Sequence, residues 1–322
     1  MIGPMDQDVV GLVGLGNMGA ALATRLTAAY RVVGFDPDPS RRRIGSDLGV
    51  VVVGSVAAIG EEAGTVVLSL PKPSISRQVI TELLDAWRAR AGLVVETSTV
   101  TPTDARAGHD ECAAAGSQYV DAAILSGVGP VAQGTSTLLL GGEEAALQRA
   151  APLLDAICVS QRRLGPAGAG MAAKVINNAV AHAVYVVLAE AVAMAVATDV
   201  PVAQLVDLLA DPDGGLLRPL THRIAERFVD GDFEGGMRTD AAYKDSTLAL
   251  QLAQEHGVPL FATQAAHTVY EIASAGAMAD KDYSVLARLW EEWTGRPLPP
   301  AGAPPGGATA QAYINDPGVV ST

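Results

Sequence analysis

A single lysine stands in a long apolar stretch of this sequence. Lys174 falls in a predicted helix over residues 171–197, whose other ionisable side chains are His182, Tyr185 and Glu190. The chain has four lysines against eighteen arginines, so lysine is a rare choice here. A cation in an apolar helix is costly unless it is paired, exposed at an end or used in chemistry. Lysine, unlike arginine, can release its proton when desolvation lowers its pKa, which suits a general acid or base.

Two asparagines interrupt the apolar character of the same predicted helix. Asn177 and Asn178 are poor helix formers that prefer caps and turns, so inside a helix they are either packed against a polar group or functional. Asn178 follows Lys174 by four residues, and positions i and i+4 share a helix face, so both side chains can point into one cleft. We predict that Lys174 and Asn178 act together and that Asn177 packs.

A glycine-rich loop near the start of the chain has the spacing of a dinucleotide-binding site. The segment GLVGLGNMGAALATRL places Gly14, Gly16 and Gly19 in a G-x-G-x-x-G pattern, with Asn17 and Met18 before the third glycine. The loop follows an apolar strand pattern and opens a predicted helix. There the first glycine makes the tight turn, the second admits a pyrophosphate and the third packs helix on strand. Free N–H groups at a helix start let an acidic protein hold an anionic cofactor.

An acid follows the next predicted strand, where such folds bind the adenosine ribose. Asp36 ends the segment RVVGFD, and a carboxylate there accepts the ribose hydroxyls and repels a 2′-phosphate. This position favours NAD over NADP. The arginines at 41–43 could instead reach a phosphate, so NADP remains possible; the alternative is that they begin a solvated helix.

The first half of the chain alternates β-branched runs with alanine-rich helical stretches, whereas the second half is helical. Strands are expected at 9–14, 31–35, 65–70, 93–98, 117–122 and 136–142. This alternation predicts an α/β fold with a doubly wound parallel sheet, followed by an all-α region. The predicted division is a dinucleotide-binding domain at 1–163, an all-α substrate and dimerisation domain at 164–295 and a flexible Pro/Gly-rich tail at 296–322.

Composition excludes several classes of function. The formal charge of −13 and the pI near 4.7 argue against a nucleic-acid partner, which needs a basic patch. The histidines show no metal-ligand spacing, and Cys112 and Cys158 are isolated, so we expect no metal and reduced, buried thiols. The first ten residues lack the basic region of a signal peptide. We therefore expect a cytoplasmic protein.

The helix over 171–197 is about 40 Å long and could cross a bilayer by length alone. However, Lys174, His182 and Glu190 are spread along it, and each charge would cost about 3 kcal/mol at the bilayer centre. We expect no membrane association. Because the helix is apolar on nearly all sides, it needs more cover than one small domain gives, which predicts a homodimer or homotetramer.

Six motifs, in order, resemble those of a known family. They are GLVGLGNMG at 11–19, LP at 70–71, ETSTVTP at 96–102, DAAILSGVGPVAQGT at 121–135, GPAGAGMAAKVINN at 165–178 and YKDSTLAL at 243–250. From about Val9 to Trp293 the chain resembles the β-hydroxyacid dehydrogenases, which include 3-hydroxyisobutyrate dehydrogenase and tartronate semialdehyde reductases and are relatives of 6-phosphogluconate dehydrogenase. The resemblance implies a Rossmann-type domain and hydride transfer between NAD(P) and a small β-hydroxy acid or its semialdehyde.

The resemblance also implies roles for individual residues. Lys174 matches the catalytic general acid/base, and Asn178 matches a residue that helps to bind the substrate. Positions near the cofactor are matched by Leu70, Pro71, Thr99 and Lys244. The alternative for Lys244 is a surface pair with Asp245.

The chain departs from the family in the loop that holds the substrate carboxylate. The family usually has a Ser-Gly-Gly run that begins four residues after the first aspartate of the 121–135 motif, but here that position is Leu125. We expect Ser126 and Gly127 to take over as substrate residues for a small carboxylic acid. The alternative is that the carboxylate is held differently and Leu125 faces an apolar substituent.

Two other functions stay open on the sequence. Imine reductases look similar in both domains but generally lack a lysine at this place, so Lys174 argues against that reading. A non-catalytic NAD(H)-binding sensor would keep the fold without turnover. Met237 also replaces what is usually an aromatic residue in the family, so the substrate remains open.

Overall fold

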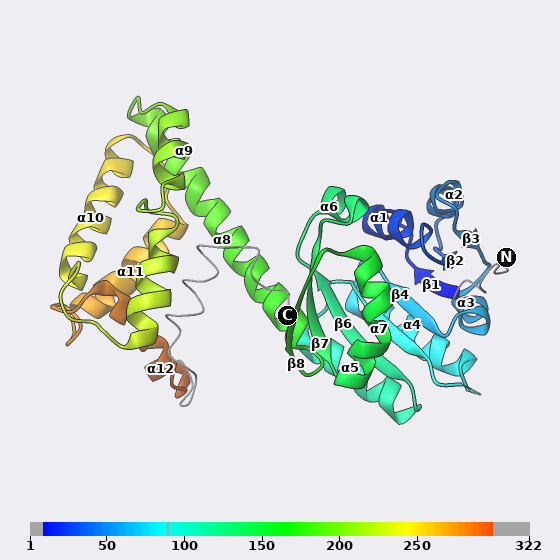
Figure 1. Cartoon of the computed structure of the whole chain (residues 1–322). Helices are drawn as coiled ribbons and strands as arrows, with labels where there is room; N and C mark the ends of the chain where they lie inside the picture. Colours follow the sequence, from blue (N-terminus) through cyan, green and yellow to red (C-terminus); the bar gives the residue numbers. More distant parts are fainter. Residues whose placement is uncertain (1–8, 89, 299–322) are drawn as a thin grey trace. The chain divides into compact units, whose positions relative to one another are not determined.

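The structure is a computed structural model that describes residues 9–88 and 90–298. It divides into two compact units, Met1–Val180 and Ala181–Thr322 (Figure 1). The division falls inside a long helix, α8 (Ala169–Ala197), whereas the sequence placed a boundary before that helix. The predicted domain limits at 163 and 295 remain predictions, and most of the predicted tail lies outside the described residues.

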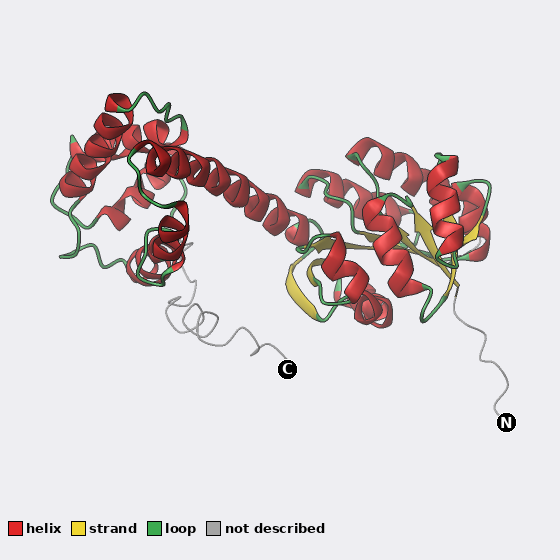
Figure 2. Cartoon of the chain, turned by 90° about the horizontal axis from the view of Figure 1, so that it is seen from above, coloured by secondary structure: helices red, strands yellow, loops and turns green. Residues whose placement is uncertain are grey.

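An eight-stranded sheet forms the centre of the first unit, in the order β3-β2-β1-β4-β5-β6-β7-β8. Its strands are β1 (Val9–Val13), β2 (Arg31–Phe35), β3 (Val51–Val52), β4 (Thr65–Leu68), β5 (Leu93–Glu96), β6 (Gln118–Ile124), β7 (Thr137–Gly142) and β8 (Ser160–Gly165). Figure 2 shows that the strands of the described chain all belong to this unit. The chain thus has the predicted α/β class, with a crossover point between β1 and β4.

One strand pair corrects the expectation of a parallel sheet. The strands from β3 to β6 pair in parallel, but β7 runs antiparallel to β6. Between them lies only the six-residue helix α6 (Val128–Gln133), which spans about 9 Å. A strand of six or seven residues is about 20 Å long, so this helix is too short to return the chain to the opposite end of the sheet.

Helices cover both faces of the sheet and bury two apolar clusters against it. The remaining helices of the unit are α1 (Asn17–Leu26), α2 (Pro39–Asp47), α3 (Val56–Glu62), α4 (Pro73–Ala86), α5 (Pro102–Ala114) and α7 (Glu144–Ile157). The cluster on one face joins the sheet to α1 and α7, and the other joins it to α3, α4 and α5. The sheet is therefore covered as a doubly wound fold requires.

The helix starts differ in a way that matters for the site. Side chains cap α2 through Asp38, α3 through Ser55 and α5 through Thr101, each by accepting a backbone N–H of the first turn. Helix α1 has Gly16 in the cap position and no side-chain cap. Its first N–H groups consequently have no side chain to satisfy them.

The second unit is built of helices joined by loops, as predicted, with one isolated bridge between Arg238 and Asp282 among its described residues. Besides the end of α8 it contains α9 (Val202–Ala210), the π-helix η1 (Pro219–Phe228), α10 (Thr239–Glu255), α11 (Ala262–Ser274), the 3₁₀ helix η2 (Tyr283–Ala287) and α12 (Arg288–Thr294). The carboxylate of Glu190 on α8 accepts hydrogen bonds from the backbone N–H groups of Phe261, Ala262 and Thr263 at 2.6, 2.8 and 3.0 Å. This acid caps α11 and joins it to α8.

Helix α8 is long and apolar enough to cross a membrane by length and composition alone. Only 11% of its most apolar 18-residue stretch is buried. Exposed apolar side chains along it include Ile176, Val180, Tyr185 and Val196. The helix thus carries many exposed apolar side chains.

Candidate active site

A cavity in the first unit has a volume of about 960 Å³ and opens where β1, β4, β5 and β6 end. Ligands of open α/β sheets bind at this edge, outside the carboxyl ends of the strands and near the crossover point. The sequence-predicted residues that line it are Gly14, Gly16, Asn17, Met18, Asp36, Leu70, Pro71, Thr99, Ser126 and Lys174.

The glycine loop forms the floor of the cavity as its spacing predicts. Gly14 has φ +92° and donates its N–H to Phe35 O at 2.9 Å, and a Cβ on it would lie 2.1 Å from the Ser69 carbonyl oxygen. A Cβ on Gly19 would lie 1.9 Å from the Gly14 carbonyl oxygen, so Gly19 supports the loop without lining the cavity. A Cβ on Gly16 would meet no atom within 4 Å. The backbone at Gly16 is therefore open to a ligand.

These features fit the pyrophosphate of a dinucleotide. The uncapped N–H groups of the first turn of α1 begin at the cavity floor, and a ten-residue helix directs its positive dipole end there. Gly14, Gly16, Asn17 and Met18 would hold the phosphates, and the nicotinamide of such a cofactor would supply hydride chemistry.

Asp36 stands at the end of β2, where the ribose of a dinucleotide would lie. Its carboxylate accepts the Leu15 N–H at 2.8 Å and the Asp38 N–H at 2.9 Å, which holds it against the glycine loop. Arg41 also lines the cavity and donates to the Asn17 side chain at 3.1 Å. Arg42 turns to backbone carbonyls instead, so Arg41 is the arginine of this run that faces the site.

A second wall comes from the segments after β4 and β5. Leu70 donates its backbone N–H to the Ser98 hydroxyl at 2.8 Å, which ties the Leu70–Pro71 segment to the Ser98–Thr99 segment. Glu96, at the end of β5, accepts the Ser98 N–H at 2.9 Å. The predicted cofactor residues Leu70, Pro71 and Thr99 are thus held by two residues, Ser98 and Glu96, to which the sequence assigned no role.

Lys174 reaches the cavity from α8. Its side chain is half-buried, and this burial lowers the pKa of its ammonium group from the ordinary range. No ion pair or hydrogen bond to its ammonium group is found among the described residues. Lys174 is therefore a partly desolvated lysine in the wall of the cofactor cavity, which is the environment a general acid or base requires.

Asp121 sets the start of the helix that carries Lys174. Its fully buried carboxylate accepts the Gly168 N–H at 2.8 Å and the Met171 N–H at 2.9 Å, one at each end of the first turn of α8. Burial raises the pKa of Asp121, against these backbone hydrogen bonds. The sequence placed Asp121 in a motif without a role; its spacing from α8 gave no signal, because the contact joins residues far apart in the chain.

The departure from the family loop resolves into two differently placed side chains. Ser126 lines the cavity, and its hydroxyl accepts the Thr137 N–H at 3.4 Å. Leu125 packs against the apolar cluster on the α4 face of the sheet. The hydroxyl at 126 and not the leucine at 125 is therefore available at the cavity wall.

Some predicted site residues are not brought to this cavity. Asn178 is half-buried and Gly127 caps α6, and neither lines the cavity. Lys244 belongs to α10 of the second unit, where its ammonium lies 3.0 Å from the Asp245 carboxylate. Their assignment to the site remains a prediction.

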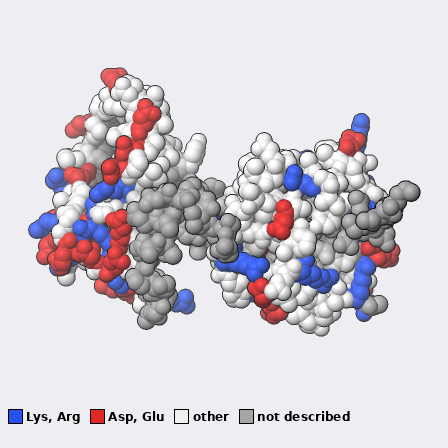
Figure 3. Space-filling view, viewed as in Figure 1, with Lys and Arg blue, Asp and Glu red and all other residues white. Residues whose placement is uncertain are grey.

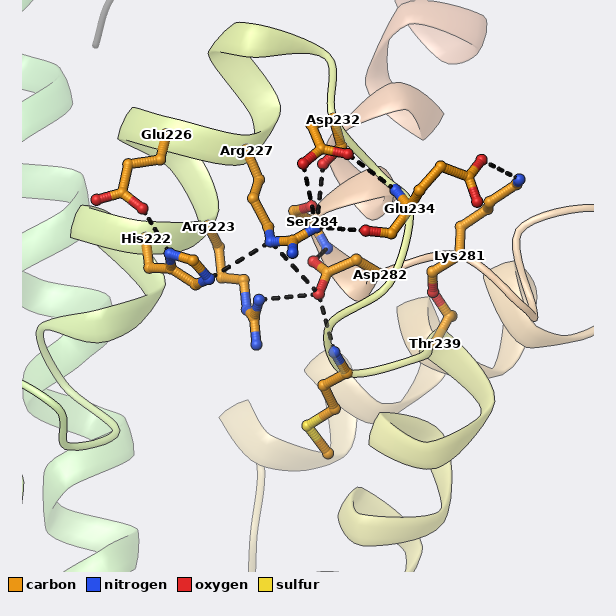
Figure 4. Close-up of polar contacts among 11 residues, drawn as sticks. His222, Arg223, Glu226, Arg227, Asp232, Glu234, Thr239, Lys281, Asp282 and Ser284 are labelled. Carbon is orange, nitrogen blue, oxygen red and sulfur yellow. Dashed lines mark hydrogen bonds and ion pairs between the residues drawn. The ribbon is translucent and has the colours of Figure 1, made fainter. Parts of the chain in front are cut away.

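A second polar cluster lies within the second unit, around Asp282 (Figure 4). Arg223 donates to its fully buried carboxylate at 2.8 Å, and the Met237 N–H donates to the same oxygen at 3.0 Å. Arg227 lies 4.0 Å away and donates to the Glu234 carbonyl at 3.0 Å. These contacts hold the loop that precedes α10, so the cluster is a structural one.

No group of three or more histidine, cysteine or carboxylate side chains suited to a metal ion occurs in the part of the chain that the structure describes. On the face shown in Figure 3, basic and acidic side chains are intermixed over the second unit rather than gathered in a basic surface. A basic surface is what a nucleic acid would need.

Comparison with known proteins identifies the family. Residues 9–163 match the NAD binding domain of 6-phosphogluconate dehydrogenase, and residues 168–290 match the family described as NAD-binding of NADP-dependent 3-hydroxyisobutyrate dehydrogenase. A Mycobacterium tuberculosis protein named a probable 3-hydroxyisobutyrate dehydrogenase is 32% identical over 86% of this chain and 96% of its own length. The NAD-dependent L-serine dehydrogenase of Pseudomonas aeruginosa is 30% identical over 89% of this chain and 99% of its own.

Solved structures agree. The M. tuberculosis 3-hydroxyisobutyrate dehydrogenase solved with L-serine is 30% identical, with a TM-score of 0.62 over 88% of this chain and 99% of that one. An imine reductase variant from Myxococcus stipitatus with NAD⁺ has a TM-score of 0.78 over 89% of this chain and 100% of that one, but at 18% identity it shows the fold alone. On its motifs, its dinucleotide cavity and these relatives, the chain belongs to the β-hydroxyacid dehydrogenases, a family of NAD(P)-dependent oxidoreductases.

Proposed function

We propose that this enzyme interconverts a small β-hydroxy acid and its semialdehyde, with Lys174 as the general acid/base and NAD as the preferred cofactor. The observation that carries the proposal is the position of Lys174, a half-buried lysine with a lowered pKa in the wall of a cavity whose floor fits a dinucleotide. A second support is the pair of relatives whose names include 3-hydroxyisobutyrate dehydrogenase and L-serine dehydrogenase, both of which act on small hydroxy acids.

The proton chemistry follows from the environment of Lys174. In the oxidative direction its neutral amine takes the proton of the substrate hydroxyl; a nicotinamide held by the glycine loop would supply the hydride acceptor. In the reductive direction its ammonium polarises the carbonyl and returns the proton to the oxygen. Partial burial favours the neutral amine and so brings the group toward its working range.

The substrate carboxylate is proposed to lie near Ser126. Its hydroxyl lines the same cavity as Lys174, and a hydroxyl donor and an ammonium together suit a small carboxylate. Gly127 and Asn178 complete the substrate contacts in this proposal, and Lys244 lies near the nicotinamide. These roles come from the family motifs rather than from contacts in the described chain.

The NAD preference rests on Asp36. Its carboxylate is fixed by two backbone N–H groups at the place where the adenosine ribose fits, and a negative charge there repels a 2′-phosphate. Arg41 faces the same cavity and is the group that would accept NADP. Titration with NADH and NADPH tests this preference. We expect a lower Kd for NADH than for NADPH, and Asp36→Ala should bring the two Kd values closer together. Tighter NADPH binding by the wild type would contradict the preference.

We propose that the enzyme is a cytoplasmic homodimer or homotetramer, and the exposed apolar surface of α8 supports the oligomer. Ile176, Tyr185 and several valines of this helix are exposed. Contiguous exposed apolar side chains mark interaction sites, and a second copy of the chain would cover them. Sedimentation velocity tests this, since a monomer at all concentrations would contradict it.

The decisive experiment follows the absorbance of reduced nicotinamide with a panel of small 3-hydroxy acids. Lys174→Ala should lower kcat/KM by about 10²–10⁴-fold while NADH still binds. Lys174→Arg is the matched variant: it keeps the charge but cannot release the proton, so its activity should fall as well. Equal rates in wild type and both variants would remove Lys174 from the mechanism. Turnover of a cyclic imine above every hydroxy acid would favour imine reduction, and NADH binding without turnover would favour a sensor.

A further inference from the structure

A buried carboxyl group immediately precedes three residues that line the cofactor cavity. Glu96 ends β5 and is only 1% exposed, and Thr97, Ser98 and Thr99 follow it at the cavity wall. Its Oε1 accepts the Ser98 N–H at 2.9 Å, and the Ser98 hydroxyl accepts the Leu70 N–H at 2.8 Å. Glu96 thus fixes one wall of the cavity through Ser98.

The other carboxyl oxygen faces helix α4. Glu96 Oε2 and the hydroxyl of Ser76 are both buried, and neither has a hydrogen bond of standard geometry among the described residues. They line a cavity of about 10 Å³, which has room for about one water molecule at most. Ser76 lies next to Ile75, and α4 contributes Ile75, Gln78, Val79 and Glu82 to the lining of the cofactor cavity. Glu96 therefore stands between two walls of the site.

The charged groups around Glu96 do not supply a cation for it. The ionisable side chains of β6 near Glu96 are those of Tyr119 and Asp121, and β4 has no ionisable side chain. Arg77 on α4 lines the same small cavity, but its guanidinium pairs with Asp104 of α5 at 2.7 Å. Burial raises the pKa of Glu96 to about 7, against the stabilising effect of Ser98 and of the nearby Ser76 hydroxyl and with a contribution from the Asp121 charge.

The two forms of Glu96 differ in what the site must accommodate. The neutral acid can accept the Ser98 N–H with one oxygen and donate its O–H to Ser76 with the other, so no charge is buried. The ionised form leaves a carboxylate in an apolar cluster, beside another acid and without a cation. Water relieves that charge only if the joint between α4 and the end of β5 opens.

We propose that Glu96 is a positioning residue for the cofactor cavity, whose neutral acid joins Ser76 on α4 to Ser98 after β5, so that its ionisation loosens both walls and weakens cofactor binding. The enzyme then takes up a proton at Glu96 when it binds cofactor near neutral pH. This inference depends on cofactor binding, not on the proposed role of Lys174.

The test measures the Kd for NADH by its fluorescence between about pH 6 and pH 8.5. The wild-type Kd should rise with pH, by about tenfold if binding shifts the pKa of Glu96 by about one unit. Glu96→Gln keeps an acceptor for Ser98 and a donor for Ser76, so it should bind tightly with no such pH dependence. Calorimetry in buffers of different ionisation enthalpy should show proton uptake on binding in the wild type but not in Glu96→Gln.

Two further variants isolate the joint. Ser76→Ala removes the partner on α4 and should weaken NADH binding at about pH 6, where Glu96 is neutral. Glu61→Gln changes an exposed acid on α3 and should keep the wild-type profile. Lys174 lines the cofactor cavity and can also titrate, but it is intact in Glu96→Gln, so a slope that persists in that variant overturns the proposal. A wild-type Kd that does not change with pH overturns it too.

Discussion

Two buried carboxylates, one in each unit, meet opposite surroundings. Glu96 in the first unit lies in an apolar cluster with hydroxyl and N–H partners, and its pKa rises to about 7 because of burial. Asp282 in the second unit is as deeply buried, but Arg223 and Arg227 bring two guanidinium groups to it, and Met237 and Ser284 donate backbone N–H groups (Figure 4).

The difference separates an acid that is paired with cations from one that is not. Arg223 and Arg227 lie beside Asp282, and the contacts of this acid hold the loop before α10. A buried acid without a cation can change its protonation near neutral pH. Acids with such perturbed pKa values cluster at functional sites of proteins. Glu96 adjoins the cofactor cavity.

The largest expected effect is the loss of Asp282. Asp282→Ala leaves Arg223 buried without its partner and frees the Met237 N–H, which should lower the free energy of unfolding by about 3–5 kcal/mol. Urea unfolding followed by tryptophan fluorescence measures this, since Trp290 and Trp293 lie in the second unit.

Asp213→Ala serves as the matched control for that experiment. Asp213 pairs with Arg218 at 2.8 Å on the surface, so its loss should cost no more than about 1 kcal/mol. Equal effects of the two substitutions would show that the buried cluster does not differ from a surface pair.

The next effect is a change in pH dependence at Glu96. The pKa of Glu96 is about 7 in the folded protein and has the ordinary value of 4.5 in the unfolded chain. Ionisation of Glu96 therefore costs more free energy in the folded state than in the unfolded state. Wild-type stability should therefore fall as pH rises from about 4.5 through 7 and stay low above it, by at most about 3 kcal/mol. Glu96→Gln should remove this fall. Thermal unfolding at about pH 5 and pH 8 measures the difference, and parallel curves for the two proteins would contradict it.

A smaller effect is expected at Asp121, whose partners are backbone N–H groups at the start of α8. Asp121→Asn retains the shape but sets an amide N–H₂ against one of these donors, which should cost about 2 kcal/mol of stability. Because the start of α8 positions Lys174, kcat should fall more than the KM for cofactor rises. A change in stability without any change in kcat would separate Asp121 from the site.

The smallest effect is expected at Glu190, which caps α11 in the second unit. Glu190→Gln keeps one good acceptor for the backbone N–H groups of Phe261, Ala262 and Thr263. The free energy of unfolding should therefore fall by only about 1 kcal/mol. Urea titration measures this change. A loss as large as that of Asp282→Ala would mean that backbone N–H groups hold a buried acid as strongly as guanidinium groups do.

The sequence predicted the strands that hold the site because those strands are apolar and regularly bounded. It missed β3, which has two residues, and β8, whose polar segment SQRRLG lies at a sheet edge and lacks the apolar pattern of a buried strand. It also could not show that β7 runs antiparallel, because strand direction depends on how far a connection reaches.

The sequence by itself determined the glycine loop and the apolar surroundings of Lys174. Gly14, Gly16 and Gly19 act locally, through turn geometry and close backbone approach, so their spacing alone carries the information. The direction of the pKa shift of Lys174 likewise followed from its apolar neighbours along one helix.

Only the tertiary structure decided what the buried acids contact. Asp121 meets the start of α8, Glu96 meets Ser76, and Asp282 meets Arg223 across separations that no local pattern records. The sequence does not distinguish a carboxylate that contacts a backbone amide from one that contacts a hydroxyl or a guanidinium group. Its charge and its role depend on burial and on partners brought from elsewhere in the chain, and these exist only once the chain is folded.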